Sequence, residues 1–420
     1  MEDLSTIFSA NYFLNGWVKP DYSGSSLTNV SNSICRWLDV PERGLPLAPL
    51  YHQKLDGEYR HILLFVVDGL GLKTLKRLFS RNGNLLTPSA RDDLLADATL
   101  FTLTSVSPST TAAALTSLWT GSAPAEHGIV GYEVWLKEYS LVANMIRQSP
   151  VAFWSEVGSL GRAGFDAGTF VPVQPLSAYL KLHQVQTTFL IDAALAQSGL
   201  TVMHMPDARV QPYFSLEDAR LTLNDLFAQQ AGQKTFTAVY WSLVDTLMHR
   251  YGPEDERIDL ELERFFYSLL LMLKTLQKKY GDNTLVLLTA DHGGIDTPVD
   301  AHFDLKNHPD LNAMLTMQPI GESRLPNFFV RLGNETRFLD YMQAEWGDAF
   351  TLIPGSDFLA TGILGDKPFH HELLQRLGDW VAIPQDGAYL WWKNHENHML
   401  GRHGGLSPEE MLVPLLGWRI

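Results

Sequence analysis

Thr111 lies in a hydroxyl-rich segment, residues 107–121, that reads Ser-Pro-Ser-Thr-Thr-Ala-Ala-Ala-Leu-Thr-Ser-Leu-Trp-Thr-Gly. Elsewhere the chain offers three aspartates and three histidines in short motifs: Asp68, Asp245, His249, Asp291, His292 and His403. Carboxylates and imidazoles together bind zinc and similar divalent cations. Two cations flanking a hydroxyl group suit phosphoryl transfer, because they stabilise both the attacking and the leaving oxygen.

Three short apolar runs end next to these aspartates. They cover residues 61–67, 236–244 and 284–289, and they lead into Asp68, Asp245 and the pair Asp291-His292. Wholly apolar runs of this length are typical of strands buried on both faces of a parallel sheet. Because sites in open α/β sheets form beyond the carboxyl ends of the strands, the three motifs are expected to meet there.

The order of these elements predicts the fold class and its division. Residues 257–280 have the apolar spacing of a long helix, and alternating strands and helices indicate an α/β fold. We predict a mostly parallel central sheet flanked by helices. Residues 1–300 and 386–420 are predicted to form this sheet and its helices as a metal-dependent catalytic core. Residues 301–385 break the alternation and are predicted as an inserted smaller α+β subdomain, placed as a lid. Residues 1–60 are predicted to be irregular.

The segment around Thr111 has two interpretations. Pro108 favours a turn, and the alanines after Thr111 favour a helix that begins there. A hydroxyl at a helix N-terminus is an ordinary cap in most proteins. It can also serve as a nucleophile, because the positive end of the helix dipole favours an alkoxide and a bound phosphate. Only the surrounding ligand motifs favour the nucleophile.

Each ligand motif taken alone also has a structural interpretation. Asp245 and His249 would share one helix face, but this spacing is common by chance. Asp291-His292-Gly-Gly could be a surface turn, and Asp68-Gly a turn or a helix cap. His403 lies among glycines, and four further histidines compete for its role: His302, His308, His395 and His398.

Composition limits the partners and the compartment. The 420 residues carry a formal net charge of −15, which disfavours a nucleic-acid polymer but not a small anionic substrate at a metal site. The single cysteine, Cys35, cannot form an internal disulfide, which fits a reducing compartment. The first residues do not have the pattern of a signal peptide, and no apolar run approaches the length of a spanning helix. We expect a cytoplasmic protein without membrane attachment.

In their order, the motifs resemble those of the alkaline phosphatase superfamily. The similarity is greatest to its nucleotide pyrophosphatase/phosphodiesterase and phosphonoacetate hydrolase branch, over roughly residues 60–300 and 387–420. The motifs that carry it are Phe-Val-Val-Asp68-Gly, Pro108-Ser-Thr-Thr111, Thr120-Gly121, His127-Gly-Ile, Asp245-x3-His249-x2-Gly-Pro253, Asp291-His292-Gly-Gly, His403-Gly-Gly and Ser407-Pro-Glu-Glu-Met-Leu-Val-Pro414. The resemblance implies an alkaline-phosphatase-like fold.

The resemblance also implies two metal sites and a nucleophile. Asp245, His249 and His403 would hold one divalent ion, and Asp68, Thr111, Asp291 and His292 the other. Zinc is the usual metal of the superfamily, and such ligands also accept manganese or iron. Thr111 is preferred to Thr110 as the nucleophile, because its offset to Thr120-Gly121 fits the branch without gaps.

Two further residues are candidate substrate contacts. Many phosphodiesterase relatives have an asparagine five residues after the His of His-Gly-Ile, and this chain has Tyr132 there. The phenol could donate a similar hydrogen bond to phosphate. Arg402, next to His403, could contact phosphate or could be a solvated surface charge.

The resemblance thus favours a metal-dependent hydrolase of phosphate diesters or nucleotide pyrophosphate bonds, acting through a phospho-threonine intermediate on a small phosphate ester. One alternative is a phosphomonoesterase or phosphonate hydrolase on the same scaffold. Another is a phosphomutase, which would keep the phosphoryl group. A fourth is a non-catalytic interaction protein that retains the fold. The sequence does not indicate an oligomeric state.

Overall fold

The computed structural model describes residues 16–152, 156–229, 232–280 and 283–420. A seven-stranded sheet forms its centre, with the strand order β2-β16-β9-β1-β8-β6-β7. The five strands from β9 to β7 are mutually parallel, and β16 is antiparallel to both of its neighbours. The bounds are β2 Ala98–Thr104, β16 Leu412–Arg419, β9 Thr284–Thr289, β1 His61–Val67, β8 Thr235–Trp241, β6 Gln186–Asp192 and β7 Arg209–Tyr213.

The apolar runs of the sequence form the central strands, and the α/β prediction is confirmed. Strands β1 and β9 coincide with the predicted runs 61–67 and 284–289, and every residue of both is buried. The third prediction was too long, because β8 ends at Trp241 and Val244 belongs to the next helix. Apolar residues of a buried helical turn continue the pattern of a buried strand, so composition alone does not mark the boundary.

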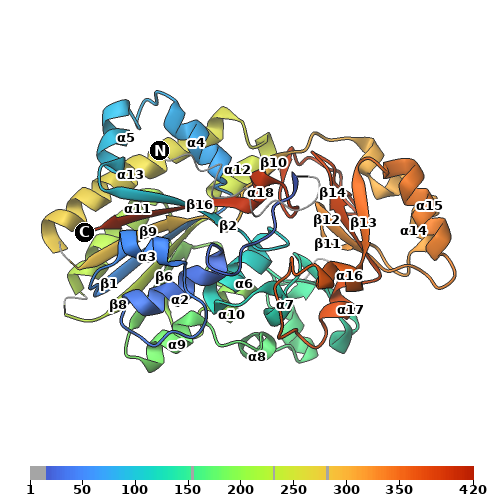
Figure 1. Cartoon of the computed structure of the whole chain (residues 1–420), viewed down its shortest axis with the longest axis horizontal. Coiled ribbons are helices and arrows are strands. Elements are labelled where there is room, and N and C mark those ends of the chain that lie inside the picture. The colour runs from blue at the N-terminus through green and yellow to red at the C-terminus, as the bar shows by residue number, and fades with distance from the viewer. Residues whose placement is uncertain (1–15, 153–155, 230–231, 281–282) are drawn as a thin grey trace.

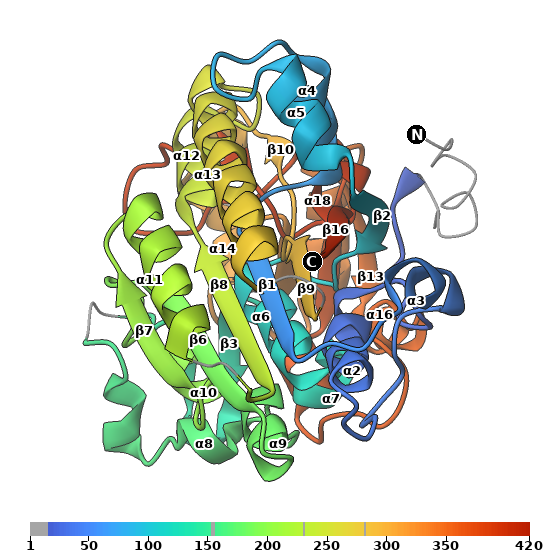
Figure 2. The same cartoon turned by 90° about the vertical axis from the view of Figure 1, so that its left-hand side faces the viewer.

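Helices cover both faces of the central sheet (Figures 1 and 2). One layer contains α4 Leu72–Ser80, α5 Pro88–Leu95, α11 Leu216–Gln229, α12 Leu243–Tyr251 and α13 Glu256–Tyr280. The other contains α2 Leu27–Trp37, α6 Thr111–Thr120, α9 Leu176–Leu182 and α10 Gly199–His204. α3 Pro49–Leu55 packs at the end where β16 and β2 pair. The predicted long helix 257–280 is confirmed as α13.

The prediction that residues 1–60 are irregular was wrong for the part that the structure describes, because α2 and α3 lie there, and residues 1–15 lie outside the described residues. Helix α2 has apolar residues at helical spacing, from Leu27 through Val30 to Ile34, which the prediction overlooked, and it also buries polar residues such as Asn29 and Asn32. Asn29 accepts a hydrogen bond from the backbone N–H of Ser26 and donates to the carbonyl of Leu45. These bonds satisfy the buried amide and order the loop that precedes α3.

A second sheet of seven antiparallel strands stands beside the first (Figure 1). Its order is β13-β14-β12-β11-β3-β4-β5, with bounds β13 Phe350–Pro354, β14 Trp380–Pro384, β12 Leu325–Phe328, β11 Ile320–Glu322, β3 Glu133–Leu136, β4 Leu141–Asn144 and β5 Ser149–Pro150. Four helices accompany it: α14 Pro309–Met314, α15 Glu335–Trp346, α16 Gly355–Ala360 and α17 Leu373–Leu377.

The second sheet extends beyond the predicted insertion 301–385. Strands β3, β4 and β5 come from residues 133–150, and Gly321 of β11 pairs with Glu133 of β3. A strand pairing between segments nearly 190 residues apart leaves no local signal in the sequence. The division of the chain into a core and an inserted lid stays a prediction.

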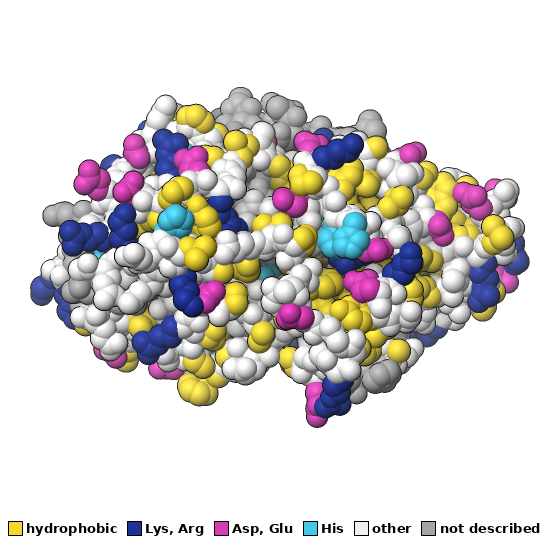
Figure 3. Space-filling view, turned by 90° about the horizontal axis from the view of Figure 1, so that it is seen from below, with side chains coloured by type: hydrophobic (Ala, Val, Ile, Leu, Met, Phe, Trp, Pro, Cys, Tyr) yellow, Lys and Arg dark blue, Asp and Glu magenta, His cyan; other side chains and the backbone are white. Residues whose placement is uncertain are grey.

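Short elements connect these layers near the carboxyl end of the central sheet. They are the two-stranded antiparallel sheet of β10 Ile295–Asp296 with β15 Gly401–Arg402, and the helices α7 Pro124–His127, α8 Ala167–Phe170 and α18 Pro408–Met411. Among the described residues, no helix has the length and apolar character needed to cross a membrane. The face in Figure 3 carries basic and acidic side chains interspersed, without a continuous basic area among its described residues.

Candidate active site

The predicted metal ligands converge beyond the carboxyl end of the central sheet. Asp68 follows β1 and Asp291 follows β9, which is adjacent to β1 in the sheet. Asp245 lies in the first turn of α12, and His249 one turn later on the same face. His403 follows β15, and the loop after β9 brings in His292. All six side chains therefore reach one region, from four segments of the chain.

The imidazole and carboxylate groups are spaced as metal ligands are. His249 Nε2 lies 3.3 Å from Asp245 Oδ2, and His403 Nε2 lies 3.7 Å from Asp245 Oδ1. His292 Nε2 lies 3.4 Å from Asp68 Oδ1 and 3.6 Å from Asp291 Oδ2. Ligand atoms around a tetrahedral zinc lie about 3.3 Å apart when its bonds are about 2.0 Å long.

The other ring nitrogen of each histidine is held by a backbone carbonyl. Nδ1 of His249 donates to Gly401 O (2.8 Å), Nδ1 of His292 to Gly293 O (2.9 Å), and Nδ1 of His403 to Ser109 O (3.0 Å). A proton on Nδ1 leaves the lone pair on Nε2, which is the atom that faces the carboxylates. Metal-binding histidines are oriented in this way in most proteins.

Three buried carboxylate oxygens in this region have no hydrogen-bond partner: Asp68 Oδ1, Asp245 Oδ1 and Asp291 Oδ2. An unpaired buried carboxylate oxygen is strongly unfavourable unless a cation neutralises it. One such atom comes from each aspartate, and each lies within 3.7 Å of an imidazole Nε2. The residues present therefore fit divalent cations.

By distance alone, the ligand atoms form two overlapping groups. One contains Asp245, His292 and His403, and the other contains Asp68, Asp291 and His292. The second matches the set expected with Thr111. The first differs from the expected set, because His292 takes the place of His249; the rings of His292 and His403 stack 3.7 Å apart. The expected division of the ligands between two ions stays a prediction.

The carboxylates perturb one another. Burial, together with the nearby charges of Asp291 and Asp245, raises the pKa of Asp68 well above its ordinary value. Burial also acts on Asp245, but the attraction of His249 and His403 outweighs it and lowers the pKa of Asp245. These opposite shifts have one origin, which is three acids packed against three imidazoles in a largely buried region.

Thr111 begins helix α6 and faces the ligand group. Its Oγ1 lies 3.2 Å from His292 Nε2. Thr110 is the residue before the helix and is 1% exposed, and its side chain interacts with Glu322 instead. Of the two adjacent hydroxyls, Thr111 is therefore the one that faces the predicted metal ligands.

The predictions missed two residues that hold the site together. Tyr240 in β8 donates a short hydrogen bond from its hydroxyl to Asp68 Oδ2. Ser109 joins the nucleophile segment to the loop of His403, because its Oγ donates to Gly405 O (2.7 Å) and accepts from the N–H of Gly404 (3.2 Å). Each is a common residue type in an ordinary context, so only the tertiary contacts single it out.

Tyr132 is linked through Glu322 to Thr110, the residue before Thr111. Its N–H donates to Glu322 Oε1 at 2.8 Å, and its hydroxyl accepts from Asn144 Nδ2 at 2.5 Å. The phenol proton is thus free for a further acceptor. Glu322, which links Tyr132 to Thr110, is partly buried, and this burial raises its pKa to about 7.

Arg402 does not face the site, contrary to the prediction that it contacts phosphate. It is 1% exposed, and its guanidinium donates to Thr297 O and Oγ1, Met399 O and Asn397 Oδ1. The guanidinium also lies 3.7 Å from the centre of the Tyr389 ring. These contacts occupy both terminal nitrogens of the guanidinium, while Nε has no hydrogen-bond partner, so Arg402 stabilises the loop that carries His403.

The competing histidines lie elsewhere. His302 and His308 pack against Trp346 beside the second sheet. His395 lies against Trp391, and the side chain of His398 is 78% exposed. None of the four belongs to either ligand group of the described residues.

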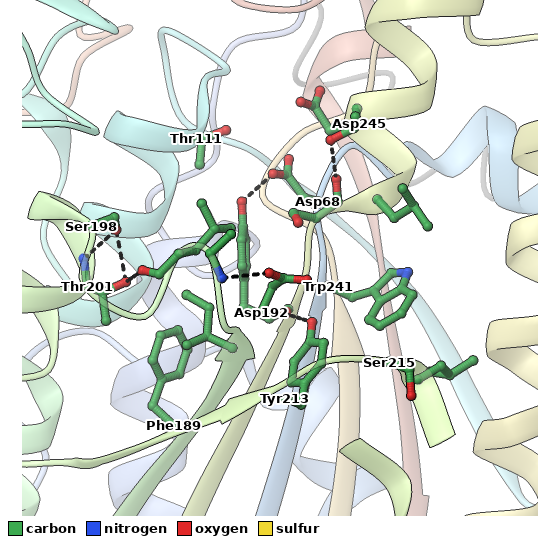
Figure 4. A pocket seen from close by; sticks show the side chains of 18 of the residues that line it. Asp68, Thr111, Phe189, Asp192, Ser198, Thr201, Tyr213, Ser215, Trp241 and Asp245 are labelled. Atoms are coloured by element: carbon green, nitrogen blue, oxygen red, sulfur yellow. Dashed lines mark hydrogen bonds between the residues drawn. The ribbon is translucent and has the colours of Figure 1, made fainter. Parts of the chain in front are cut away.

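A cavity of about 820 Å³ opens beside Thr111. Figure 4 shows Thr111, Asp68 and Asp245 at its upper end, with Phe189 and Tyr213 at its lower end. Its walls come from α6, β6, α10 and the segments after β7 and β8. Thr111 and two of the predicted metal ligands therefore border a space large enough for an organic group.

The sequence matches the family described as type I phosphodiesterase / nucleotide pyrophosphatase over residues 62–406. A search among curated proteins finds no match. Murine ectonucleotide pyrophosphatase / phosphodiesterase 5 has a similar structure, with a TM-score of 0.60 and 16% identity over 84% of this chain and 87% of that one. The same protein has also been solved as an inactive threonine-to-alanine variant in complex with AMP.

A bacterial enzyme has the same fold. Phosphonoacetate hydrolase from Sinorhizobium meliloti 1021, in complex with phosphonoformate, superposes with a TM-score of 0.61 and 15% identity over 85% of this chain and 89% of that one. At these identities the likeness establishes a shared fold.

Proposed function

The chain belongs to the type I phosphodiesterase / nucleotide pyrophosphatase family, and from this membership we propose that it hydrolyses phosphate diesters or nucleotide pyrophosphate bonds. The reaction would pass through a phospho-threonine intermediate on Thr111. The observation that carries the proposal is the group of three unpartnered carboxylate oxygens and three inward-facing imidazole nitrogens next to the Thr111 hydroxyl.

In the first step, Thr111 Oγ1 attacks phosphorus in line with the departing oxygen. The P–O bond to that oxygen breaks, and the leaving group takes the electron pair. The N-terminus of α6 stabilises negative charge at Oγ1 and at the phosphoryl oxygens. In the second step, water attacks the same phosphorus and releases the Thr111 hydroxyl.

Asp68, Asp291 and His292 would hold one divalent ion beside Thr111, and Asp245, His249 and His403 would hold the other. When bound, such ions lower the pKa of hydroxyl groups and neutralise charge on the transferred phosphoryl group. We propose zinc, because the ligand set is mixed carboxylate and imidazole, and the same set accepts manganese or iron. Tyr240 and Ser109 would keep these ligands in place.

The structural relatives support this proposal. One binds AMP and is described as inactive when a threonine is replaced by alanine. The other binds phosphonoformate, so a phosphonate hydrolase is the second candidate. The cavity beside Thr111 favours the diester, because a phosphate monoester with a small alcohol would leave most of it unfilled. Phosphomutase and non-catalytic roles have no feature of the described residues in their favour.

The proposed compartment is the cytoplasm. Cys35 is buried and free, and it is the single cysteine of the chain. A protein without disulfides is compatible with reducing conditions. The proposed substrate is a small phosphate ester rather than a nucleic-acid polymer, as the net charge of −15 suggests.

The test compares rates on bis-p-nitrophenyl phosphate and p-nitrophenyl phosphate with zinc-loaded protein. We expect a diester preference of about tenfold or more, which corresponds to about 1.4 kcal/mol of barrier. Thr111→Ala should abolish turnover and retain its metal content, whereas Thr110→Ala should keep measurable activity. A Thr111→Ala variant within about tenfold of wild type would exclude Thr111 as the nucleophile.

A further inference from the structure

The cavity follows helix α6 away from the nucleophile. Thr111, Leu115 and Trp119 are spaced i, i+4 and i+8, so they lie on one face of the helix, and all three line the cavity. Eight residues of helix correspond to about 12 Å at about 1.5 Å per residue. The cavity is therefore an elongated space that starts at the hydroxyl of Thr111.

The opposite wall is also apolar. Phe189 and Ile191 of β6 and Leu200 of α10 line it, and each is buried. At the inner end the rings of Trp119 and Phe189 meet edge to face, 5.8 Å apart. These residues leave an apolar volume next to the reacting centre that their own side chains do not fill.

The charge around the cavity disfavours a further anionic group. Apart from the predicted metal ligands, its lining contains three acidic residues, Asp192, Glu217 and Glu261. Arg264 is the one lysine or arginine among the described residues that line it. A second phosphate or a carboxylate inside the cavity would meet net negative charge in a region of low dielectric. An uncharged group would not.

The outer rim of the cavity exposes large apolar side chains. Leu85, Phe214, Leu243 and Tyr267 all line it and are 44%, 82%, 37% and 38% exposed. An isolated exposed apolar residue is common, whereas four around one cavity give it a partly apolar rim.

We propose that this cavity binds an extended apolar chain of the substrate, attached to phosphorus through the ester oxygen that is retained during the first step. This inference rests on the proposed diester hydrolysis. In-line attack places the leaving oxygen opposite Thr111 Oγ1. Because the cavity runs back along the helix of Thr111, a chain inside it lies on the nucleophile's side and stays on phosphorus. The substrate class is then a phosphate diester with an alkyl substituent, rather than a nucleoside polyphosphate.

The first experiment measures kcat/KM on p-nitrophenyl alkyl phosphates, with chains from methyl to octyl on the retained oxygen. Each buried methylene contributes about 0.8 kcal/mol, so we expect a rise of up to about fourfold per methylene until the cavity is filled. The p-nitrophenyl ester of thymidine 5′-monophosphate is the nucleotide comparison. A flat chain-length profile, or a nucleotide ester that exceeds the octyl ester, would overturn the inference.

Two variants test the location of the chain. Leu115→Trp and Leu200→Trp fill the cavity from opposite walls, so each should lower the ratio of kcat/KM for the octyl ester to kcat/KM for the methyl ester by at least about tenfold. Leu182→Trp is the matched control, because Leu182 is 69% exposed and does not line the cavity. Equal losses on both esters in both cavity variants would contradict the assignment.

A binding experiment separates this inference from the proposed function. Calorimetry on the zinc-loaded protein compares n-octylphosphonate with methylphosphonate, and a chain in the cavity should bind at least about tenfold more tightly with a more negative heat-capacity change. If no diester is hydrolysed but the octyl compound binds better, the proposed function fails and the cavity assignment stands. If the methyl ester is hydrolysed but neither turnover nor binding depends on chain length, the proposed function stands and the cavity assignment fails.

Discussion

The backbone carbonyl of Ser109 accepts a hydrogen bond from Nδ1 of His403 at 3.0 Å, although the two residues are almost 300 positions apart in sequence. Ser109 lies two residues before Thr111, and its side chain also bonds the two glycines that follow His403. The nucleophile segment and the last predicted metal ligand are therefore held as one unit. A displacement of either would move the other.

Ser109→Ala tests this coupling. Loss of the Oγ removes the bonds to Gly404 and Gly405 while the carbonyl to His403 remains, so we expect a loss of about 10- to 100-fold in zinc affinity and in turnover. Competition with a metal-binding dye measures the affinity. Ser107→Ala is the control, because Ser107 is equally buried and its Oγ has no hydrogen-bond partner. A variant with unchanged affinity for zinc would show that Ser109 is only structural.

Metal removal should destabilise the protein, because the carboxylates of Asp68 and Asp291 then repel each other. Asp291→Asn should relieve this repulsion. Asp291 Oδ1 accepts from the N–H groups of Gly69 and His292, and Asn keeps these bonds. Without metal, one charge fewer beside Asp68 should raise the free energy of unfolding by about 1 kcal/mol or more.

With zinc bound, the wild type should be the more stable of the two proteins, because it binds the ion better than Asp291→Asn does. At a free zinc concentration of a thousand times its dissociation constant, it gains about 4 kcal/mol. Thermal melts with chelator and with zinc measure both states. Asp348→Asn, at an exposed position, is the control. If the wild type were the more stable protein in chelator as well, the repulsion argument would be wrong.

His204 should make the protein sensitive to acid. It is buried against Thr116, and burial lowers its pKa from 6.5 to about 3. In this interval the unfolded chain binds a proton that the folded chain does not, so stability is lost as the pH falls. His204→Gln should remove a slope of about 1.4 kcal/mol per pH unit from the free energy of unfolding between these two values.

Urea titrations at several pH values below 6.5 measure this slope. His371→Gln is the matched control, because the His371 side chain is 81% exposed. An unchanged slope in His204→Gln would mean that other groups dominate acid unfolding.

Arg402→Lys distinguishes a structural arginine from a phosphate contact. Lysine cannot reproduce the fork of bonds to Thr297, Met399 and Asn397, so the free energy of unfolding should fall by about 3 kcal/mol. KM for a diester should stay within about threefold of wild type. A large rise of KM at unchanged stability would restore the prediction that Arg402 binds substrate.

The residues that the sequence alone identified are those whose signal is local. Strands β1 and β9 were predicted to the residue, because a strand buried on both faces is a continuous apolar run. The types and order of the ligand motifs indicated a metal-dependent hydrolase, since each motif is a few adjacent residues. The family match over residues 62–406 confirms the superfamily to which those motifs pointed.

Tertiary structure decided everything that depends on where a side chain points. Arg402 and His403 are adjacent, yet one turns into its own loop and the other toward Asp245. The pairing of β3 with β11 joins residues 133 and 321, and the path from Thr111 to Trp119 becomes a cavity only when β6 and α10 pack opposite. Periodicity reports burial along one segment, whereas orientation and empty volume arise from contacts between distant segments, which the local pattern of residues does not encode.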